Sequence, residues 1–124
     1  MTSDPRLTRD SVIRNRGREV YIDDQRLGLA RSLAVVPHSP TGFMWGYGGS
    51  GPAQLALALL LEAGLGDRDA DRLHHPFKWE VVAKLPHDGF ELHGSTVWDW
   101  LGDCADAEAL FASMARETTA RGLR

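Results

Sequence analysis

The chain has 124 residues, of which 43% are hydrophobic and 25% are charged, as is typical of one globular domain with one core. A formal net charge of −3 gives no general attraction to nucleic acid or acidic membranes. The single cysteine, Cys104, cannot form an intrachain disulfide, and the longest apolar run is too short to cross a bilayer. The N-terminus lacks the apolar stretch of a signal peptide. We therefore expect a cytoplasmic protein without a cofactor, binding neither membrane nor nucleic acid.

The N-terminal part predicts an arm followed by a hairpin. Residues 1–16 are polar and arginine-rich, and we assign them to a flexible arm, with one helical turn around 11–14. A single domain then occupies 17–124. Its first strand is predicted at 18–22, and after the Asp23-Asp24 turn the chain returns at 25–29.

The middle of the chain predicts a third strand and then a buried helix. Ser32 to Val36 is the strand, ended by Pro37. The helix begins at Gly51-Pro52, because proline is favoured in the first helical turn. Its leucines point in every direction, which predicts burial on most sides. Gly64 and Gly66 end it.

Further helices and one more strand follow. A helix is predicted over 69–85, with an interruption at Pro76, and a short strand at 90–93. Ser95 can cap the next helix, and a last amphipathic helix is predicted over 106–120. The fold class is therefore α+β, in which a small antiparallel sheet packs on a buried central helix and two to three further helices.

A glycine-rich stretch stands directly before the central helix. Residues 46–51 match G-x-G-x-x-G, but no second βαβ half follows, so we reject a dinucleotide-binding Rossmann site. The Gly-Lys-Ser/Thr of a P-loop is also missing. What remains is the property of any helix start, whose free N–H groups and partial positive charge attract anions.

The stretch therefore has two interpretations. In the first it holds a phosphate-bearing ligand, and in the second it is a tight structural corner whose aromatic residues fill the core. Under the first interpretation the glycine amides and Ser50 hold phosphate, an aromatic residue stacks on a base, and further polar groups assist. The predicted ligand-binding residues are His38, Ser39, Trp45, Tyr47, Gly48, Gly49, Ser50, Gly51, Gln54 and Lys78.

Catalytic and metal chemistry have weaker support. The five histidines lack the helical spacing of a zinc motif, so we predict no metal site. Ser39 or Ser50 with His38 or His93 would form the nucleophilic pair of a small hydrolase, but no G-x-S-x-G elbow is present. We predict no catalytic residue, and a hydrolase is the third hypothesis for function.

Trp98 and Trp100 support a protein-binding alternative. They lie two apart on one predicted helix and so point in different directions, which leaves one at the surface or at an interface. An inhibitor or adaptor would use this surface together with the C-terminal helix. A homo-oligomer stays open, because the sequence does not fix the oligomeric state.

One run of residues resembles a known family. HSPTGFMWGYGGSGPAQLALALL, followed by Phe77-Lys78, Val81-Val82-Ala83 and Leu85-Pro86, is similar to an uncharacterised family of bacteria, archaea, phages and plasmids. The similarity covers about residues 18–101. The family supplies no activity and no catalytic residue, but it implies a mobile-element setting in which small proteins counter host defence.

The sequence thus favours a non-enzymatic binding module for a phosphate-bearing small ligand, such as a nucleotide or signalling nucleotide. The partner is then a small anion, or, under the alternative, a host defence protein.

Overall fold

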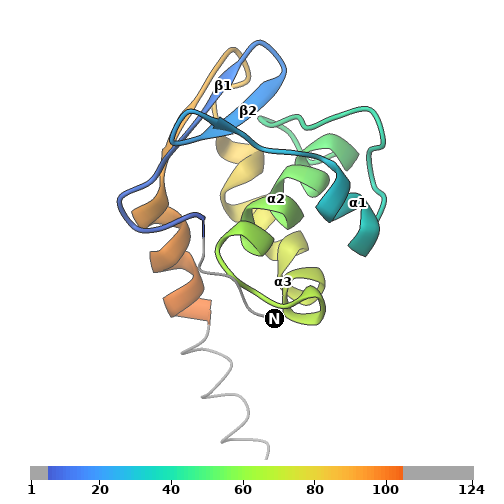
Figure 1. Cartoon of the computed structure of the whole chain (residues 1–124), viewed down its shortest axis with the longest axis vertical. Coiled ribbons are helices and arrows are strands. Elements are labelled where there is room, and N and C mark those ends of the chain that lie inside the picture. Colours follow the sequence, from blue (N-terminus) through green and yellow to red (C-terminus); the bar gives the residue numbers. More distant parts are fainter. Residues whose placement is uncertain (1–5, 105–124) are drawn as a thin grey trace, which may run out of the picture.

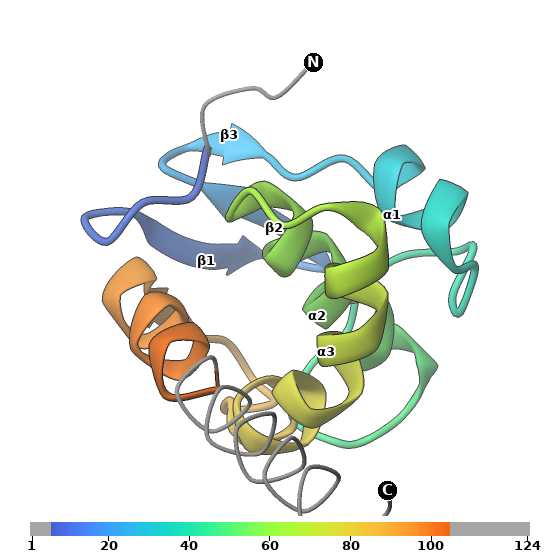
Figure 2. The same cartoon turned by 90° about the horizontal axis from the view of Figure 1, so that it is seen from below.

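The computed structural model describes residues 6–104, which form one α+β unit with a four-stranded antiparallel sheet and a layer of helices. The strands lie in the order β3-β2-β1-β4. Figures 1 and 2 show the sheet on one side, with α2 and α3 crossing the opposite side. The sequence-based fold class, a small antiparallel sheet packed on helices, is confirmed.

The sheet begins earlier than the sequence predicted. Strand β1, Val12–Arg16, falls in the segment assigned to a flexible arm, but it pairs with both β2, Glu19–Ile22, and β4, Glu91–His93. The alternation of its side chains explains the strand, since Ile13 is fully buried while Arg14 is exposed. The helical turn expected around 11–14 is wrong for the same reason.

The hairpin turn was predicted correctly. Asp23 and Asp24 both adopt positive φ, which aspartate tolerates better than most residues, and the Asp23 carboxylate accepts a hydrogen bond from the Val12 amide at 2.9 Å. The returning strand β3, Gln25–Arg26, is only two residues long.

The strand predicted at 32–36 is wrong, because the segment forms helix α1, Ala30–Val35. The valines and alanine of this segment suggested a buried strand. The Ser32 hydroxyl donates to the Leu29 carbonyl at 3.1 Å within the helical turn, and α1 packs against α2.

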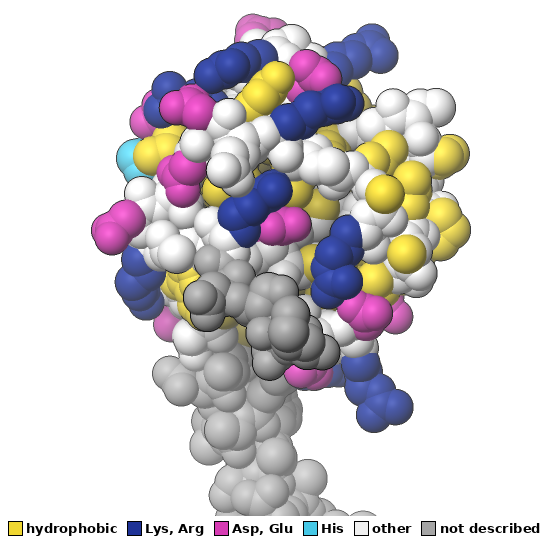
Figure 3. Space-filling model, in the orientation of Figure 1, with side chains coloured by type: hydrophobic (Ala, Val, Ile, Leu, Met, Phe, Trp, Pro, Cys, Tyr) yellow, Lys and Arg dark blue, Asp and Glu magenta, His cyan; other side chains and the backbone are white. Residues whose placement is uncertain are grey.

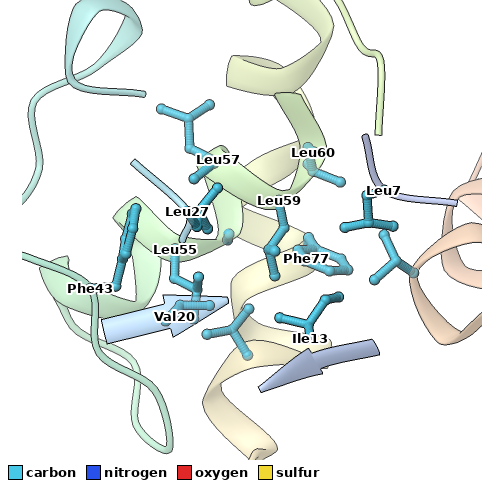
Figure 4. Packing of buried hydrophobic residues seen from close by; sticks show 14 of the residues in the cluster. Leu7, Ile13, Val20, Leu27, Phe43, Leu55, Leu57, Leu59, Leu60 and Phe77 are labelled. Carbon is cyan, nitrogen blue, oxygen red and sulfur yellow. The ribbon is translucent and has the colours of Figure 1, made fainter. Parts of the chain in front are cut away.

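Helix α2, Ser50–Glu62, forms the centre of the core. Residues 51–61 are all buried, which explains the absence of a polar face in the sequence. Figure 4 shows Leu59 beside Phe77 of α3, with Ile13 of β1 below them and Leu55 near Val20. Gly64 follows the helix with φ +103°, a left-handed conformation that suits glycine at a helix end.

Helix α3, Asp67–Glu80, packs against α2 and continues through Pro76. Of the kink or fresh start expected at Pro76, the fresh start is absent, and the helix ends before a 3₁₀ turn, η1, Val82–Lys84. A further helix begins at residue 94 and is described up to 104 (Figure 2). The predicted helix over 106–120 lies outside the described residues.

The surface is mixed in charge. Figure 3 shows basic and acidic side chains interspersed on one face, with apolar side chains gathered over the α1 side. Of the helices within residues 6–104, none has the length and apolar character needed to span a bilayer.

Candidate functional site

The start of α2 carries unused hydrogen-bond donors. Within residues 6–104, the amides of residues 48–51 donate no hydrogen bond to a protein acceptor, and no side chain caps the helix. The first helical bond runs from the Ala53 amide to the Gly49 carbonyl at 3.0 Å. The Ser50 side chain is exposed beside these amides. A helix start of this kind attracts anions.

The glycines of this loop are also needed for packing. A Cβ at Gly48 would lie 2.1 Å from the Trp79 ring, and a Cβ at Gly49 would lie 2.4 Å from the Tyr47 ring. Gly51 lies against Met44 in the same way. The structural-corner interpretation therefore explains why the glycines are present, while the free amides remain to be explained by something else.

Lys78 supplies a positive charge next to this loop. Its side chain is only 7% exposed, yet within the described chain its ammonium has no hydrogen-bond or ion-pair partner. Nζ lies 4.2 Å from the centre of the Trp79 ring, the ring that packs on Gly48. Nζ is not among the fully buried atoms, so the stem is covered while the charged tip reaches the surface.

Gln54 fixes the position of His38. Its Oε1 accepts hydrogen bonds from the amides of His38 at 2.7 Å and Ser39 at 2.9 Å. Its Nε2 donates to the Ser32 hydroxyl at 2.9 Å and to the Val36 carbonyl at 3.1 Å. Gln54 is fully buried, so one side chain of α2 ties α1 and the following loop to the core.

Three histidines meet beside this loop. His38 Nε2 lies 2.8 Å from His74 Nε2, and the ligand atoms of His38, His74 and His75 all lie within 4.8 Å of one another. His74 is 1% exposed and its Nδ1 lies 2.5 Å from the Asp71 carbonyl. Since a carbonyl only accepts, Nδ1 of His74 carries the proton, and the Nε2 lone pair faces His38.

Burial sets the charge state of two of these rings. Desolvation lowers the pKa of His38, and the neighbouring positive charges of His75 and Lys78 lower it further against the opposing effect of Asp71. Burial also lowers the pKa of His74, although its hydrogen bond to the Asp71 carbonyl acts in the opposite direction. Both rings are therefore neutral near pH 7.

The lowered pKa values predict a loss of stability in mild acid. Below about pH 6.5, the ordinary histidine value, the unfolded chain binds protons that the folded rings resist. The free energy of unfolding should be constant above that pH and fall as the pH drops through it toward the lowered folded values. Urea denaturation between pH 8 and pH 5 measures this dependence.

The variant His74→Gln isolates the contribution of this ring. Whatever the stability of the variant at pH 8, its free energy of unfolding should depend less on pH than that of the wild type. The control His93→Gln, at a strand residue whose side chain is 61% exposed, should keep the wild-type slope. An identical pH dependence in wild type and His74→Gln would contradict this interpretation of the cluster.

Two predicted ligand contacts are used inside the fold instead. Both polar atoms of the Gln54 side chain already form the hydrogen bonds given above, so this side chain has no further hydrogen bond to offer a ligand. Trp45 is 3% exposed, packs edge-on against Phe90 and donates from its indole nitrogen to the His87 carbonyl at 3.2 Å. A base cannot stack on a ring in that position.

The remaining predicted residues divide between two places. Tyr47 is 46% exposed and lies with the free amides and Lys78. Ser39 lines a separate groove between the β2–β3 hairpin and the segment 41–44. Among the described residues, neither the Ser39 nor the Ser50 hydroxyl bonds to a histidine, so the nucleophilic pair of a hydrolase is not formed here.

The tryptophans of the protein-binding alternative are held by the chain itself. The Trp98 indole nitrogen donates to the Leu7 carbonyl at 3.0 Å, and Trp100 packs edge-on against Phe77. Both are partly buried against the core. The large exposed aromatic rings within residues 6–104 are instead Tyr47 and Trp79, the latter 57% exposed.

Sequence reasoning missed Trp79, His74 and His75 as site residues. The two histidines are adjacent in sequence, a spacing that does not form a metal motif on one helix. The cluster forms only because the fold brings His38, 36 residues before His74, against both rings. The available signal was the helical spacing of His74 and Lys78, which are four residues apart and both buried.

A family model described as a family of unknown function (DUF6166) matches residues 10–103, and the chain belongs to that family. The resemblance drawn from the sequence is confirmed as membership of a family of unknown function. No curated protein and no solved structure shows a significant match. Function must therefore be argued from the site.

Proposed function

We propose that this member of a family of unknown function is a non-enzymatic binding module for a phosphate-bearing small ligand, held at the start of α2. The observation that carries the proposal is Lys78, a cation with a nearly covered side chain and no counter-ion in the described chain. The stem of the side chain is covered while the ammonium reaches the surface, so the charge is held in place beside the start of α2. An anionic ligand would supply the missing counter-ion.

The groups around Lys78 support an oxyanion in particular. The amides of residues 48–51 supply up to four directed N–H donors, and the Ser50 hydroxyl adds another. The helix start contributes a partial positive charge of about half a unit. Phosphate matches this set, because it carries several acceptor oxygens and a full negative charge.

The exposed aromatic rings favour a nucleotide over free phosphate. Tyr47 packs against Gly49 and Trp79 packs against Gly48, and both rings keep a large exposed fraction. A base stacked on such a ring gains about 1–3 kcal/mol. In this proposal Trp79, rather than the buried Trp45, supplies the stacking ring.

A thermal-shift series tests the proposal. Inorganic phosphate, mononucleotides and cyclic dinucleotides should raise the melting temperature, whereas nucleosides without phosphate should not. A ligand at one hundred times its dissociation constant stabilises the folded state by about 2.7 kcal/mol. Lys78→Met should abolish the shift, since it keeps the buried stem and removes the charge.

The chain offers a matched control, because its other lysine, Lys84, is exposed. Phosphate compounds should raise the melting temperature of Lys84→Met as much as that of the wild type. The proposal fails if Lys78→Met retains the shift, or if nucleosides stabilise the protein as well as nucleotides do.

The setting implied by the family resemblance is part of the proposal. A mobile-element protein of this kind would sequester a nucleotide signal used in host defence, and a preference for cyclic dinucleotides would favour that role. If no phosphate compound raises the melting temperature, the alternative of a protein-binding inhibitor or adaptor becomes the leading hypothesis. Recovery of a chemically unchanged ligand would argue against the hydrolase.

A further inference from the structure

A second site, independent of the proposed phosphate site, is formed by the three histidines. We propose that His38, His74 and His75 bind one divalent transition-metal ion of the zinc type, which prefers imidazole nitrogen. The ligand atoms come from two parts of the chain, the loop after α1 and the middle of α3. Because these segments are far apart in sequence, the ion would cross-link them.

The distances suit a single ion. Zinc–nitrogen bonds are about 2.0–2.1 Å long, so two nitrogens bound to one ion lie at most about 4.2 Å apart. His38 Nε2 and His74 Nε2, 2.8 Å apart, are within that limit and would separate to about 3.3 Å around a tetrahedral ion. The ligand atoms of all three residues lie within 4.8 Å of one another, so the exposed His75 ring would move slightly toward the other two when the ion binds.

Two of the proposed metal ligands are already held in position by contacts within the protein. The His74 ring is held by Nδ1–H donation to the Asp71 carbonyl, an arrangement that in metal sites fixes which nitrogen faces the ion. His38 is held through its backbone by Gln54. The ring of His38 donates from Nε2 to His74 without metal, and moving that proton to Nδ1 frees Nε2 for the ion without changing its charge.

The local charge is mixed. The Asp71 carboxylate lies 3.7 Å from His74 Nδ1 and favours a cation, whereas Lys78 and any protonated His75 oppose one. Three neutral imidazoles leave a fourth position for water or another ligand, which is the composition of open zinc sites. Removal of the Lys78 charge should therefore strengthen metal binding slightly while it abolishes phosphate binding.

Titration with Co²⁺ and Zn²⁺ tests the inference on the full chain in phosphate-free buffer. Co²⁺ should bind with one-to-one stoichiometry, show the intense visible bands of a four-coordinate ion and be displaced by Zn²⁺. His75→Ala should weaken binding at least tenfold. Its ring is exposed, so the metal-free variant should unfold at the wild-type urea concentration.

Two controls separate this site from other causes. His93→Ala removes an exposed histidine outside the cluster and should leave Co²⁺ binding unchanged. Lys78→Met should still bind Co²⁺. Failure of the phosphate site and failure of the metal site are therefore distinguishable. The inference is overturned if no visible bands appear, or if His93→Ala loses as much affinity as His75→Ala.

Discussion

Replacement of Gln54 by leucine is expected to lower the free energy of unfolding by about 3–5 kcal/mol, although leucine fills a similar volume. Four hydrogen bonds are lost at once, each worth a net of about 0.5–1.5 kcal/mol, and within residues 6–104 the Ser39 amide has no other partner. Each buried group left without a partner costs about 1–3 kcal/mol, less where water can reach it. Urea denaturation followed by circular dichroism measures the loss.

Gln25→Leu is the control, because Gln25 is exposed on β3 and should change stability by no more than about 0.5 kcal/mol. The Gln54 variant should also bind Co²⁺ more weakly, since the His38 backbone is no longer held. If Gln54→Leu is as stable as wild type, Gln54 does not organise the loop as described.

Removal of the Phe77 ring is the second large effect. Phe77→Ala should cost about 3–5 kcal/mol, because a fully buried ring is replaced by a cavity. The ring faces Leu59 of α2 (Figure 4) and packs edge-on against Trp100 at 5.0 Å between centroids. It therefore joins α2, α3 and the helix from residue 94.

Phe77→Leu provides the graded comparison, with an expected loss of about 1–2 kcal/mol because less volume is removed. Both losses are read from urea denaturation at pH 8, where the histidines do not contribute. A loss below about 1 kcal/mol for Phe77→Ala would place this residue outside the core.

The sequence was most informative where structure depends on local pattern. The turn at Asp23-Asp24, the all-buried α2 and its end at Gly64 follow from turn chemistry and leucine spacing. Helix α1 could not be predicted in the same way. Its valines and alanine favour a buried strand, whereas the helix packs on α2 and bonds to Gln54 through Ser32, contacts that lie outside the local pattern.

The site was predictable in part for the same reason. Ser50, the glycine amides and Lys78 follow from the helix start and the composition. Their relation to Trp79 depends on how α3 packs beside α2, and the histidine cluster depends on a contact across 36 residues. Single-sequence spacing does not contain such contacts. Gln54 looked available because its amide had no visible partner in the sequence, and Trp45 because an aromatic ring in the glycine-rich stretch could stack on a base.

The central claim is that the open start of α2 and the unpaired Lys78 together hold an anion. Nuclear magnetic resonance tests it directly, because each amide of Gly48, Gly49, Ser50 and Gly51 gives its own signal. Titration with inorganic phosphate should move these four signals together and saturably in the wild type, and should leave them in place in Lys78→Met. Signals that stay fixed in the wild type, or that move equally in the variant, would contradict the account.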